Sequence, residues 1–253
     1  MPLVAAPLCE LDQVACLWNG LAMEAAHSES GFSKAKLALT IMGALTLSAL
    51  MVGLGSLWLG DEIANTTHTD AKRHVEIIIG GETLFIPVNE IRFKPQRRPG
   101  RRDRADLYFL WPSGLGFSKT LEQQFNAGGS DSNLIFIVVT KRQGDPDMSG
   151  RLDLVYKPFF EGVPHAGPAG LSVQRLRKGA GFDGEALFFQ PNRTMPFVAR
   201  CPIHDALPDL KYCLRDIHAG QNLHVSYRFP IHLIAEWKSI EELVRNKVAD
   251  WRR

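Results

Sequence analysis

The longest uncharged stretch of the chain runs from Leu37 to Gly60 and separates a short tail from a larger domain. As a helix rising 1.5 Å per residue it would be roughly 36 Å long, enough to cross a hydrocarbon core of ~30 Å. A buried core helix would present a polar face, and a cleaved signal peptide would have a shorter apolar core followed by a small-residue cleavage site. The pattern therefore favours an uncleaved transmembrane helix over residues 37–60.

The charges beside this stretch predict its orientation. Lys34 and Lys36 precede it, whereas Asp61 and Glu62 follow it and the next basic residues come only at positions 72 and 73. Basic residues next to a span remain in the cytoplasm, and acidic residues have little influence. We expect a cytoplasmic tail over residues 1–36, or from Met23 if translation begins there, and an extracytoplasmic C-terminal domain.

Beyond a polar linker over residues 61–74, apolar and β-branched runs alternate with turn residues. Such runs predict strands, and Gly-rich turns between adjacent runs predict hairpins. Three hairpins are expected, around Gly80-Gly81, around residues 179–184 and around residues 219–222. The runs of the hairpins and the other expected strands cover residues 75–79, 83–88, 106–111, 134–140, 151–157, 171–178, 185–190, 197–201, 211–218 and 223–229.

One of these strands is predicted from an alternation of apolar and polar residues. Leu152, Leu154 and Tyr156 alternate with polar residues, which predicts a half-exposed strand over residues 151–157. Residues 119–125 are expected to form a short helix that ends before Gly128-Gly129.

After Pro230 the apolar period changes to that of a helix. The spacing of the apolar residues is four, three, four, four and three, which predicts an amphipathic C-terminal helix with one buried stripe. Glu241 and Arg245 form an i, i+4 pair on another face. We expect the stripe to pack on the sheet, although docking on a partner or self-association would use the same face. The stripe comprises Leu233, Trp237, Ile240, Val244, Val248 and Trp251.

Together these elements predict a mostly β, α+β protein. One N-terminal transmembrane helix precedes a domain over residues 75–253, built as an antiparallel β-sandwich or a strongly curved sheet and closed by the C-terminal helix. The chain has 253 residues, 45% apolar and 22% charged, which is ordinary for a globular domain with one span. The net charge of +2 does not indicate a nucleic-acid-binding protein.

The cysteines bear on the redox compartment. Cys9 and Cys16 lie in the tail, whereas Cys201 and Cys213 lie in the domain. If the domain is extracytoplasmic, Cys201 and Cys213 could form a disulfide, the alternative being two buried thiols. No CxxC pair occurs, so neither a redox motif nor a zinc knuckle is indicated.

A basic segment over residues 94–104 carries six Lys and Arg residues, one acid and two prolines. Proline spacing and charge repulsion predict a loop. The loop could bind an anionic partner, such as lipid headgroups, an envelope polymer or an acidic protein patch, or it could serve only to keep an edge strand soluble. The candidate binding residues are Arg97, Arg98, Arg101, Arg102 and Arg104.

No catalytic motif of the nucleophile-elbow, phosphate-loop, zinc-protease or dinucleotide-binding type occurs. Histidines gather near the cysteines, at positions 204, 218, 224 and 232. His218 and His224 would share one sheet face if the turn between their strands has an odd number of residues, and opposite faces if it has four. A metal site or an acid–base pair is then conceivable, but ordinary surface histidines are the simpler reading, so we assign no catalytic residue, metal or cofactor.

The sequence thus favours a single-pass membrane protein whose extracytoplasmic domain binds or scaffolds a partner at the cell envelope without catalysis. Its partners would be the bilayer, through residues 37–60, and an envelope protein or anionic polymer. Small residues four apart, Ala49 and Gly53, would also allow a homodimer. The alternative is a membrane-tethered hydrolase or metal-dependent enzyme that uses His204, His218 and His224.

Overall fold

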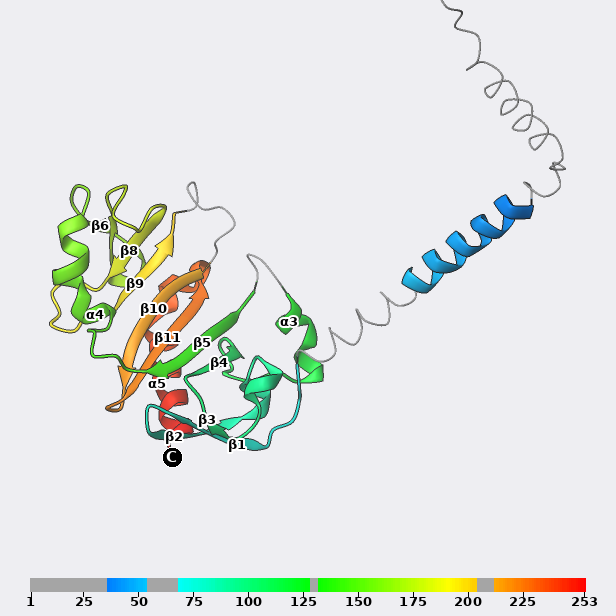
Figure 1. The fold of residues 1–253 in the computed structure, drawn as a ribbon. Coiled ribbons are helices and arrows are strands. Elements are labelled where there is room, and N and C mark those ends of the chain that lie inside the picture. The colour runs from blue at the N-terminus through cyan, green and yellow to red at the C-terminus, as the bar shows by residue number, and fades with distance from the viewer. Residues whose placement is uncertain (1–35, 54–67, 128–131, 204–211) are drawn as a thin grey trace, which may run out of the picture. The chain divides into compact units, whose positions relative to one another are not determined.

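The computed structural model describes residues 36–53, 68–127, 132–203 and 212–253, coloured in Figure 1. The chain divides into two compact units, Met1–Glu62 and Ile63–Arg253. In the first unit, an 18-residue helix spans Lys36–Gly53, is apolar and long enough to cross a membrane, and has exposed side chains throughout. Residues 54–60 of the expected span lie outside the described residues. The predicted dimer contact at Ala49 and Gly53 stays a prediction.

The second unit is an α+β domain, as the sequence predicts. Its large sheet has eight strands in the order β4-β5-β11-β10-β9-β8-β7-β6, and every neighbouring pair is antiparallel. The bounds of these strands are β4 Arg104–Leu110, β5 Leu134–Lys141, β6 His165–Ala166, β7 Ser172–Arg175, β8 Glu185–Phe189, β9 Val198–Pro202, β10 Tyr212–Ala219 and β11 Leu223–Pro230.

A smaller sheet has the order β2-β1-β3. β1 (His74–Ile79) and β2 (Glu82–Pro87) form the predicted antiparallel hairpin, and β3 (Gly100–Arg101) adds to β1 in parallel. Gly80 and Gly81 at the turn have φ of +61° and +88°, a region that side chains with a Cβ rarely adopt. The basic segment over residues 94–104, which the sequence predicts to be a loop, therefore contains the two-residue strand β3.

The other two predicted hairpins are also present, as β7–β8 and β10–β11. The last turn has an odd length, because Ala219 pairs with Leu223 and three residues lie between them. His218 is consequently opposite His224, and both side chains leave the sheet on the same face.

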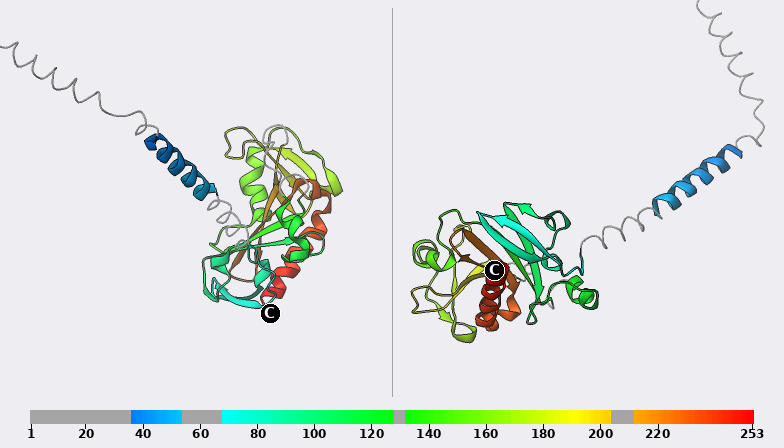
Figure 2. Two further views of the ribbon diagram at one scale, coloured as in Figure 1. Left: turned by 90° about the vertical axis from the view of Figure 1, so that its right-hand side faces the viewer. Right: turned by 90° about the horizontal axis from the view of Figure 1, so that it is seen from below.

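The C-terminal helix covers one face of the large sheet (Figure 2). A 3₁₀ segment over Ile231–Glu236 leads into α5 (Trp237–Trp251), and all six residues of the predicted stripe are at most 8% exposed. They join one core with the inward residues of β1, β2, β4, β5, β10 and β11. The amphipathic helix predicted from the change of period after Pro230 is therefore confirmed, and its apolar stripe packs on the sheet.

The predicted strand over residues 151–157 is wrong. The segment forms α4 (Met148–Arg151), a π-helical turn over Leu152–Tyr156 and a 3₁₀ turn over Lys157–Phe159. Leu152 and Tyr156 are four residues apart and buried, whereas Leu154 is 77% exposed. Asp147 begins the helix by accepting a hydrogen bond from the Gly150 amide.

The short helix near residue 120 is confirmed as a 3₁₀ turn (Lys119–Leu121) followed by α3 (Glu122–Asn126). Its Phe125 packs with Tyr108, Phe117 and the ring of His68 in a separate small core. The described end of the expected linker is part of the domain, because the amides of Val88 and Asn89 donate to the carbonyls of Arg73 and Ala71.

Candidate functional site

The large sheet has one face that the described elements leave partly open. β5, β11 and β10 turn one set of side chains toward α5, and these are buried. The alternate set points the other way; Leu134, Asp216 and Pro230 in this set are buried, and its other members are half-buried or exposed. We call this surface the open face. Its half-buried or exposed residues are Phe136, Val138 and Thr140 on β5, His224, Ser226 and Arg228 on β11, and Tyr212, Leu214 and His218 on β10.

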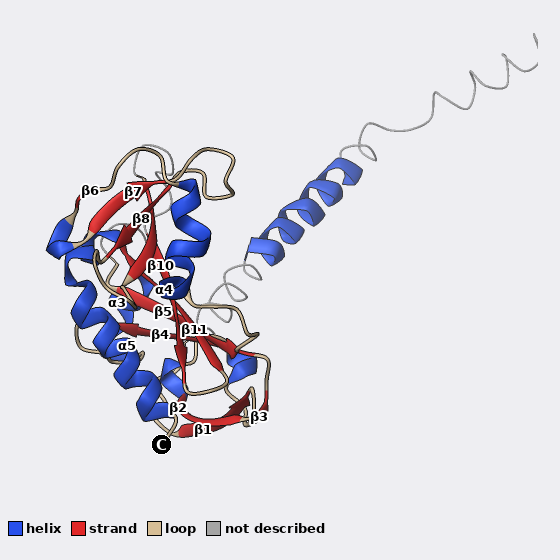
Figure 3. Cartoon of the chain, turned by 90° about the vertical axis from the view of Figure 1, so that its left-hand side faces the viewer, coloured by secondary structure: helices blue, strands red, loops and turns tan. Residues whose placement is uncertain are grey.

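Helical segments cover the same side of the sheet at both ends of the open face. α4 and the turns after it pack on Leu187, Phe189 and Val198 over β8 and β9. At the other end, α3 and Phe117 cover Tyr108 and Leu110 of β4. Figure 3 shows α4 and α5 on opposite sides of the sheet. The open face is therefore a strip of sheet between two helical borders.

The strand register brings polar residues into rows across the open face. Arg104 of β4 is opposite Thr140, which is opposite His224, which is opposite His218. In the next row, Asp106 and Asp216 lie at the two ends. The strip is thus polar along one edge and carries an aromatic pair, Phe136 with Tyr212 at 5.6 Å between ring centroids, further along.

The two carboxylates of this face are already paired. Asp106 accepts hydrogen bonds from Arg104 and from the Gln96 side-chain amide. Asp216 accepts from Arg151 and from the Met148 amide. Because each carboxylate is neutralised by one arginine, the remaining arginines determine the charge that the face presents.

Among the described residues beside the open face, Arg228 and Arg92 are cations that no carboxylate neutralises. Arg228 is exposed on β11 and forms no ion pair within the described residues. The guanidinium of Arg92 lies 5.0 Å from the centroid of Phe93 and 5.1 Å from that of Phe136, a cation–π geometry. The face therefore combines aromatic surface with net positive charge.

The five candidate arginines of the basic segment have different roles. Arg97 is only 8% exposed, and its guanidinium donates to the carbonyls of Ile91 and Arg92 at 3.0 Å each. Arg97 thus holds its own loop together, a role that the charge pattern does not reveal. Arg104 is tied to Asp106, and Arg102 donates to the Arg98 carbonyl.

Of the five candidate arginines, Arg98 and Arg101 are the two that are exposed and have no side-chain hydrogen bond or ion pair within the described residues. The segment joins β4 at Arg104, so it borders the end of the polar row on the open face. That the basic segment binds an anionic partner remains a prediction, and Arg98 and Arg101 are the side chains best placed for this role.

The histidine pair lies beside a hollow of about 300 Å³ at the corner of the open face. The ring centroids of His218 and His224 are 5.8 Å apart. Burial and the charge of Arg142 lower the pKa of His218. The lining of the hollow comprises Thr140, Lys141, Gln143, Asp145, Pro146, Arg151, His218 and His224.

The structure places His232 away from this pair and does not describe His204. His232 lies against the Asn133 side chain at 3.1 Å. Within the described ranges, no three His, Cys, Asp or Glu residues are grouped closely enough to hold a metal ion. The three-histidine enzyme site expected as the alternative stays a prediction.

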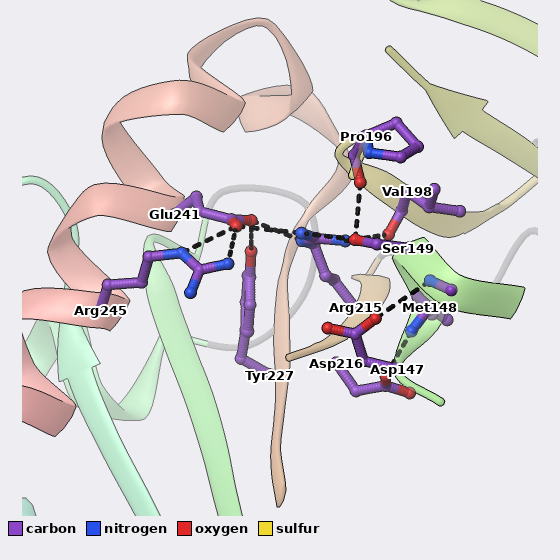
Figure 4. A network of polar contacts seen from close by, with 11 residues as sticks. Asp147, Met148, Ser149, Pro196, Val198, Arg215, Asp216, Tyr227, Glu241 and Arg245 are labelled. Atoms are coloured by element: carbon purple, nitrogen blue, oxygen red, sulfur yellow. Dashed lines mark hydrogen bonds and ion pairs between the residues drawn. The ribbon is translucent and has the colours of Figure 1, made fainter. Parts of the chain in front are cut away.

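A buried polar network fixes the framework behind the open face (Figure 4). Arg215 of β10 is 2% exposed and donates to both carboxylate oxygens of Glu241 on α5, at 2.5 and 2.9 Å. Tyr227 and Arg245 donate to the same carboxylate at 2.9 and 2.6 Å. Burial alone would raise the pKa of Glu241, but its hydrogen bonds and charge pairing with Arg215 and Arg245 lower it to about 2.

The same arginine reaches the N-terminal end of α4. Arg215 donates to the Val198 carbonyl at 3.0 Å and approaches the hydroxyl of Ser149, which itself donates to the Pro196 carbonyl. Its neighbour Asp216 points to the other side of the sheet and binds Met148. This network links α5, β10, β9 and α4, so it sets the position of one border of the open face.

The predicted disulfide is present. Cys201 on β9 and Cys213 on β10 are bonded and fully buried, with their Cα atoms 4.1 Å apart. They flank the one register pair that joins these strands, Leu214 with Arg200. The bond therefore holds the two halves of the large sheet together where their ladder is shortest.

Sequence reasoning found the histidine pair and the disulfide but missed the open face. Which side of β5, β10 and β11 stays uncovered depends on where α4 and α5 pack, and their positions come from long-range contacts. The one available signal was parity, because half of the positions in each of these strands are polar, aromatic or small.

No protein-family model matches the chain, and no curated protein matches its sequence. Two solved structures are similar to it in fold. One is an immunity protein of the Stenotrophomonas maltophilia type IV secretion system, Smlt3025, at 12% identity and a TM-score of 0.45, covering 72% of this chain and 94% of that chain. The other is FrpD, an iron-regulated outer membrane lipoprotein of Neisseria meningitidis, also at 12% identity and a TM-score of 0.45, covering 73% and 95%.

Proposed function

We propose that this protein is a single-pass membrane protein whose extracytoplasmic domain binds an acidic protein partner at the cell envelope and does not act as a catalyst. The apolar helix Lys36–Gly53, with Lys34 and Lys36 at its N-terminal end, supports an anchor with its N-terminus in the cytoplasm. The Cys201–Cys213 disulfide supports an oxidising compartment for the domain. For the domain organisation we propose the expected tail over residues 1–36, span over residues 37–60 and linker from residue 61, with residues 68–73 counted as part of the domain.

The observation that carries the binding role is the open face. A sheet face covered by helices at both ends and exposed between them offers half-buried apolar side chains, including Phe136, Val138 and Tyr212, in a fixed arrangement. Exposed apolar surface with a polar surround is typical of interaction sites. Aromatic residues and arginine are also the types enriched in interface cores.

Charge determines the kind of partner. Asp106 and Asp216 are each paired, whereas Arg228 and Arg92 are not neutralised by a carboxylate in the described chain. Arg98 and Arg101 extend the positive surface beyond Arg104. Complementary charge accelerates association and disfavours partners of like charge. An acidic protein surface therefore fits this face better than a neutral or basic one.

Site-specific photo-cross-linking in native membranes tests this function. A photoreactive residue replaces Ser226, which is half-buried on the open face, and in a matched control it replaces Asn246, which is exposed on α5 behind the sheet. We expect a discrete cross-linked protein from position 226 and none from position 246.

Charge variants sharpen the test. Arg228→Glu should reduce the yield from position 226 severalfold, and Arg98→Ser with Arg101→Ser should reduce it mainly at low ionic strength, where screening is weak. The absence of a product from position 226, or a yield that does not respond to Arg228→Glu, would contradict the proposed function.

A further inference from the structure

The pair His218 and His224 has a geometry that the rest of the open face does not share. The two residues are directly opposite on neighbouring antiparallel strands, their side chains lie on one face, and their ring centroids are 5.8 Å apart. Both residues are half-buried. The structure gives neither imidazole a hydrogen-bond partner among the described residues, so the ring nitrogens remain available to a ligand.

The turn that joins the two strands is held in place from outside the hairpin. Glu82 of β2 accepts hydrogen bonds from the amides of Gln221 and Asn222, at 3.2 and 2.8 Å, and pairs with Arg252 after α5. Gly220 has φ of +60°, and a Cβ there would collide with the Arg252 guanidinium. The register that sets the two histidines opposite each other is therefore fixed by β2 and by the end of the C-terminal helix.

The surroundings of the pair carry balanced charge. Lys141 and Arg151 line the hollow and Arg142 is close to His218, whereas the acids that face the pair are Asp145, Asp147 and Asp216. These three cations and three anions balance in formal charge. The ligand preference of this corner is therefore determined by its two imidazoles.

We propose that His218 and His224 together chelate a divalent late first-row metal ion such as Cu²⁺, Ni²⁺ or Zn²⁺. Two imidazoles bound to one ion through metal–nitrogen bonds of ~2.0–2.1 Å place their ring centroids roughly 4.5 Å apart at a 90° angle and roughly 5 Å apart at a tetrahedral angle. The observed 5.8 Å is therefore close enough for both rings to reach one ion after a side-chain adjustment of about 1 Å. Imidazole nitrogen is a preferred ligand of these metals, and among them Cu²⁺ binds most tightly. Water fills the remaining coordination positions, and the hollow provides room for it.

This site is independent of the partner proposed above, because it concerns one corner of the open face and needs no second protein. It also differs from the three-histidine enzyme site, since it uses only two protein ligands and no residue outside the described ranges.

Copper binding to the full chain in detergent tests the proposal. The protein carries no histidine tag, and Cys9→Ser and Cys16→Ser remove the tail thiols as competing ligands. Titration with Cu²⁺ at neutral pH, followed by calorimetry and by the nitrogen hyperfine pattern in electron paramagnetic resonance, should reveal one site with two equivalent nitrogen ligands. His218→Gln and His224→Gln should each weaken binding at least tenfold.

His165→Gln is the matched control, because His165 is exposed on the edge strand β6, far along the sheet order from this pair. Its Cu²⁺ affinity should equal that of the parent protein. Circular dichroism verifies that each variant is folded, and the melting temperature of the parent, but not of the variants at 218 and 224, should rise with Cu²⁺. Equal affinity in the parent and in the His218→Gln/His224→Gln double variant would overturn the proposal.

Discussion

Arg215 and Glu241 form a buried, bidentate ion pair that joins the large sheet to the C-terminal helix. The two residues are 26 positions apart in sequence, on β10 and α5. Arg215 also contacts the carbonyl of Val198, and Glu241 also accepts from Tyr227 and Arg245. Because the guanidinium of Arg215 and the carboxylate of Glu241 both have hydrogen-bond partners, the pair is satisfied within the core.

Removing one partner of this pair should destabilise the domain strongly. Arg215→Met leaves Glu241 with a buried charge that only Arg245 and Tyr227 compensate, and the expected loss is about 3–5 kcal/mol of unfolding free energy. Arg245→Ala removes a half-exposed partner and should cost less than about 1 kcal/mol. Denaturant titration of the full chain in detergent measures both. Equal losses in the two variants would contradict the structure of the network.

The same carboxylate predicts a dependence of stability on pH. The pKa of Glu241 is lowered to about 2 in the folded protein, against an ordinary value of 4.5. The stabilisation, about 3 kcal/mol from 1.36 kcal/mol per pKa unit, is present above pH 4.5 and is lost as the pH falls from there toward 2. The difference in unfolding free energy between the parent and Glu241→Gln should therefore shrink as the pH falls through this range. A difference that stays constant from pH 6 to pH 3 would show that Glu241 has an ordinary pKa.

Leu152 and Leu154 distinguish the helical turn from the strand that the sequence suggests. In the structure Leu152 is 6% exposed and packs on β8 and β9, whereas Leu154 is 77% exposed. Leu152→Ala should cost about 2–5 kcal/mol, and Leu154→Ser should change stability by no more than about 0.5 kcal/mol. In a half-exposed strand, residues two apart would share a face and the two variants would behave alike. Thermal melts of the two variants decide between these arrangements.

The disulfide should contribute measurably to stability. In the chain-entropy model, closing a loop of this size between Cys201 and Cys213 is worth about 3 kcal/mol. Cys201→Ala with Cys213→Ala should lower the unfolding free energy by about that amount, and a reducing agent should lower that of the parent but not that of the double variant. If the reducing agent leaves the parent unchanged, the bond does not stabilise the folded domain.

The successes and failures of the sequence-based prediction have physical causes. The stripe from Leu233 to Trp251 repeats over many residues, so a helix is the only regular structure that buries it. By contrast, Leu152 and Tyr156 are both two residues from Leu154 and four from each other, so the same spacing fits a strand and a helix. The segment is helical because Leu152 and Tyr156 are buried together, and their burial depends on contacts with β8 and β9.

The candidate sites also include residues that the sequence could predict and residues that it could not. The parity argument for His218 and His224 was sound, but the number of turn residues had to come from the register. Arg97 is indistinguishable from Arg98 in the sequence, and only the fold shows that its guanidinium is used inside the loop. The partners of Arg215 come from α4, β9 and α5, a combination that no local pattern encodes.

The most direct test of the account asks on which side of the membrane the domain lies, because the acidic partner and the disulfide both depend on it. Cys201 and Cys213 are fully buried and would report poorly, so a reporter cysteine replaces Asn246, which is exposed on α5. In the Cys9→Ser/Cys16→Ser background, a membrane-impermeant maleimide should label this cysteine on intact cells, whereas Ser28→Cys in the tail should be labelled only after lysis. If position 246 is labelled only after lysis, the extracytoplasmic location and the function built on it are contradicted. This holds whether position 28 is labelled on intact cells or only after lysis.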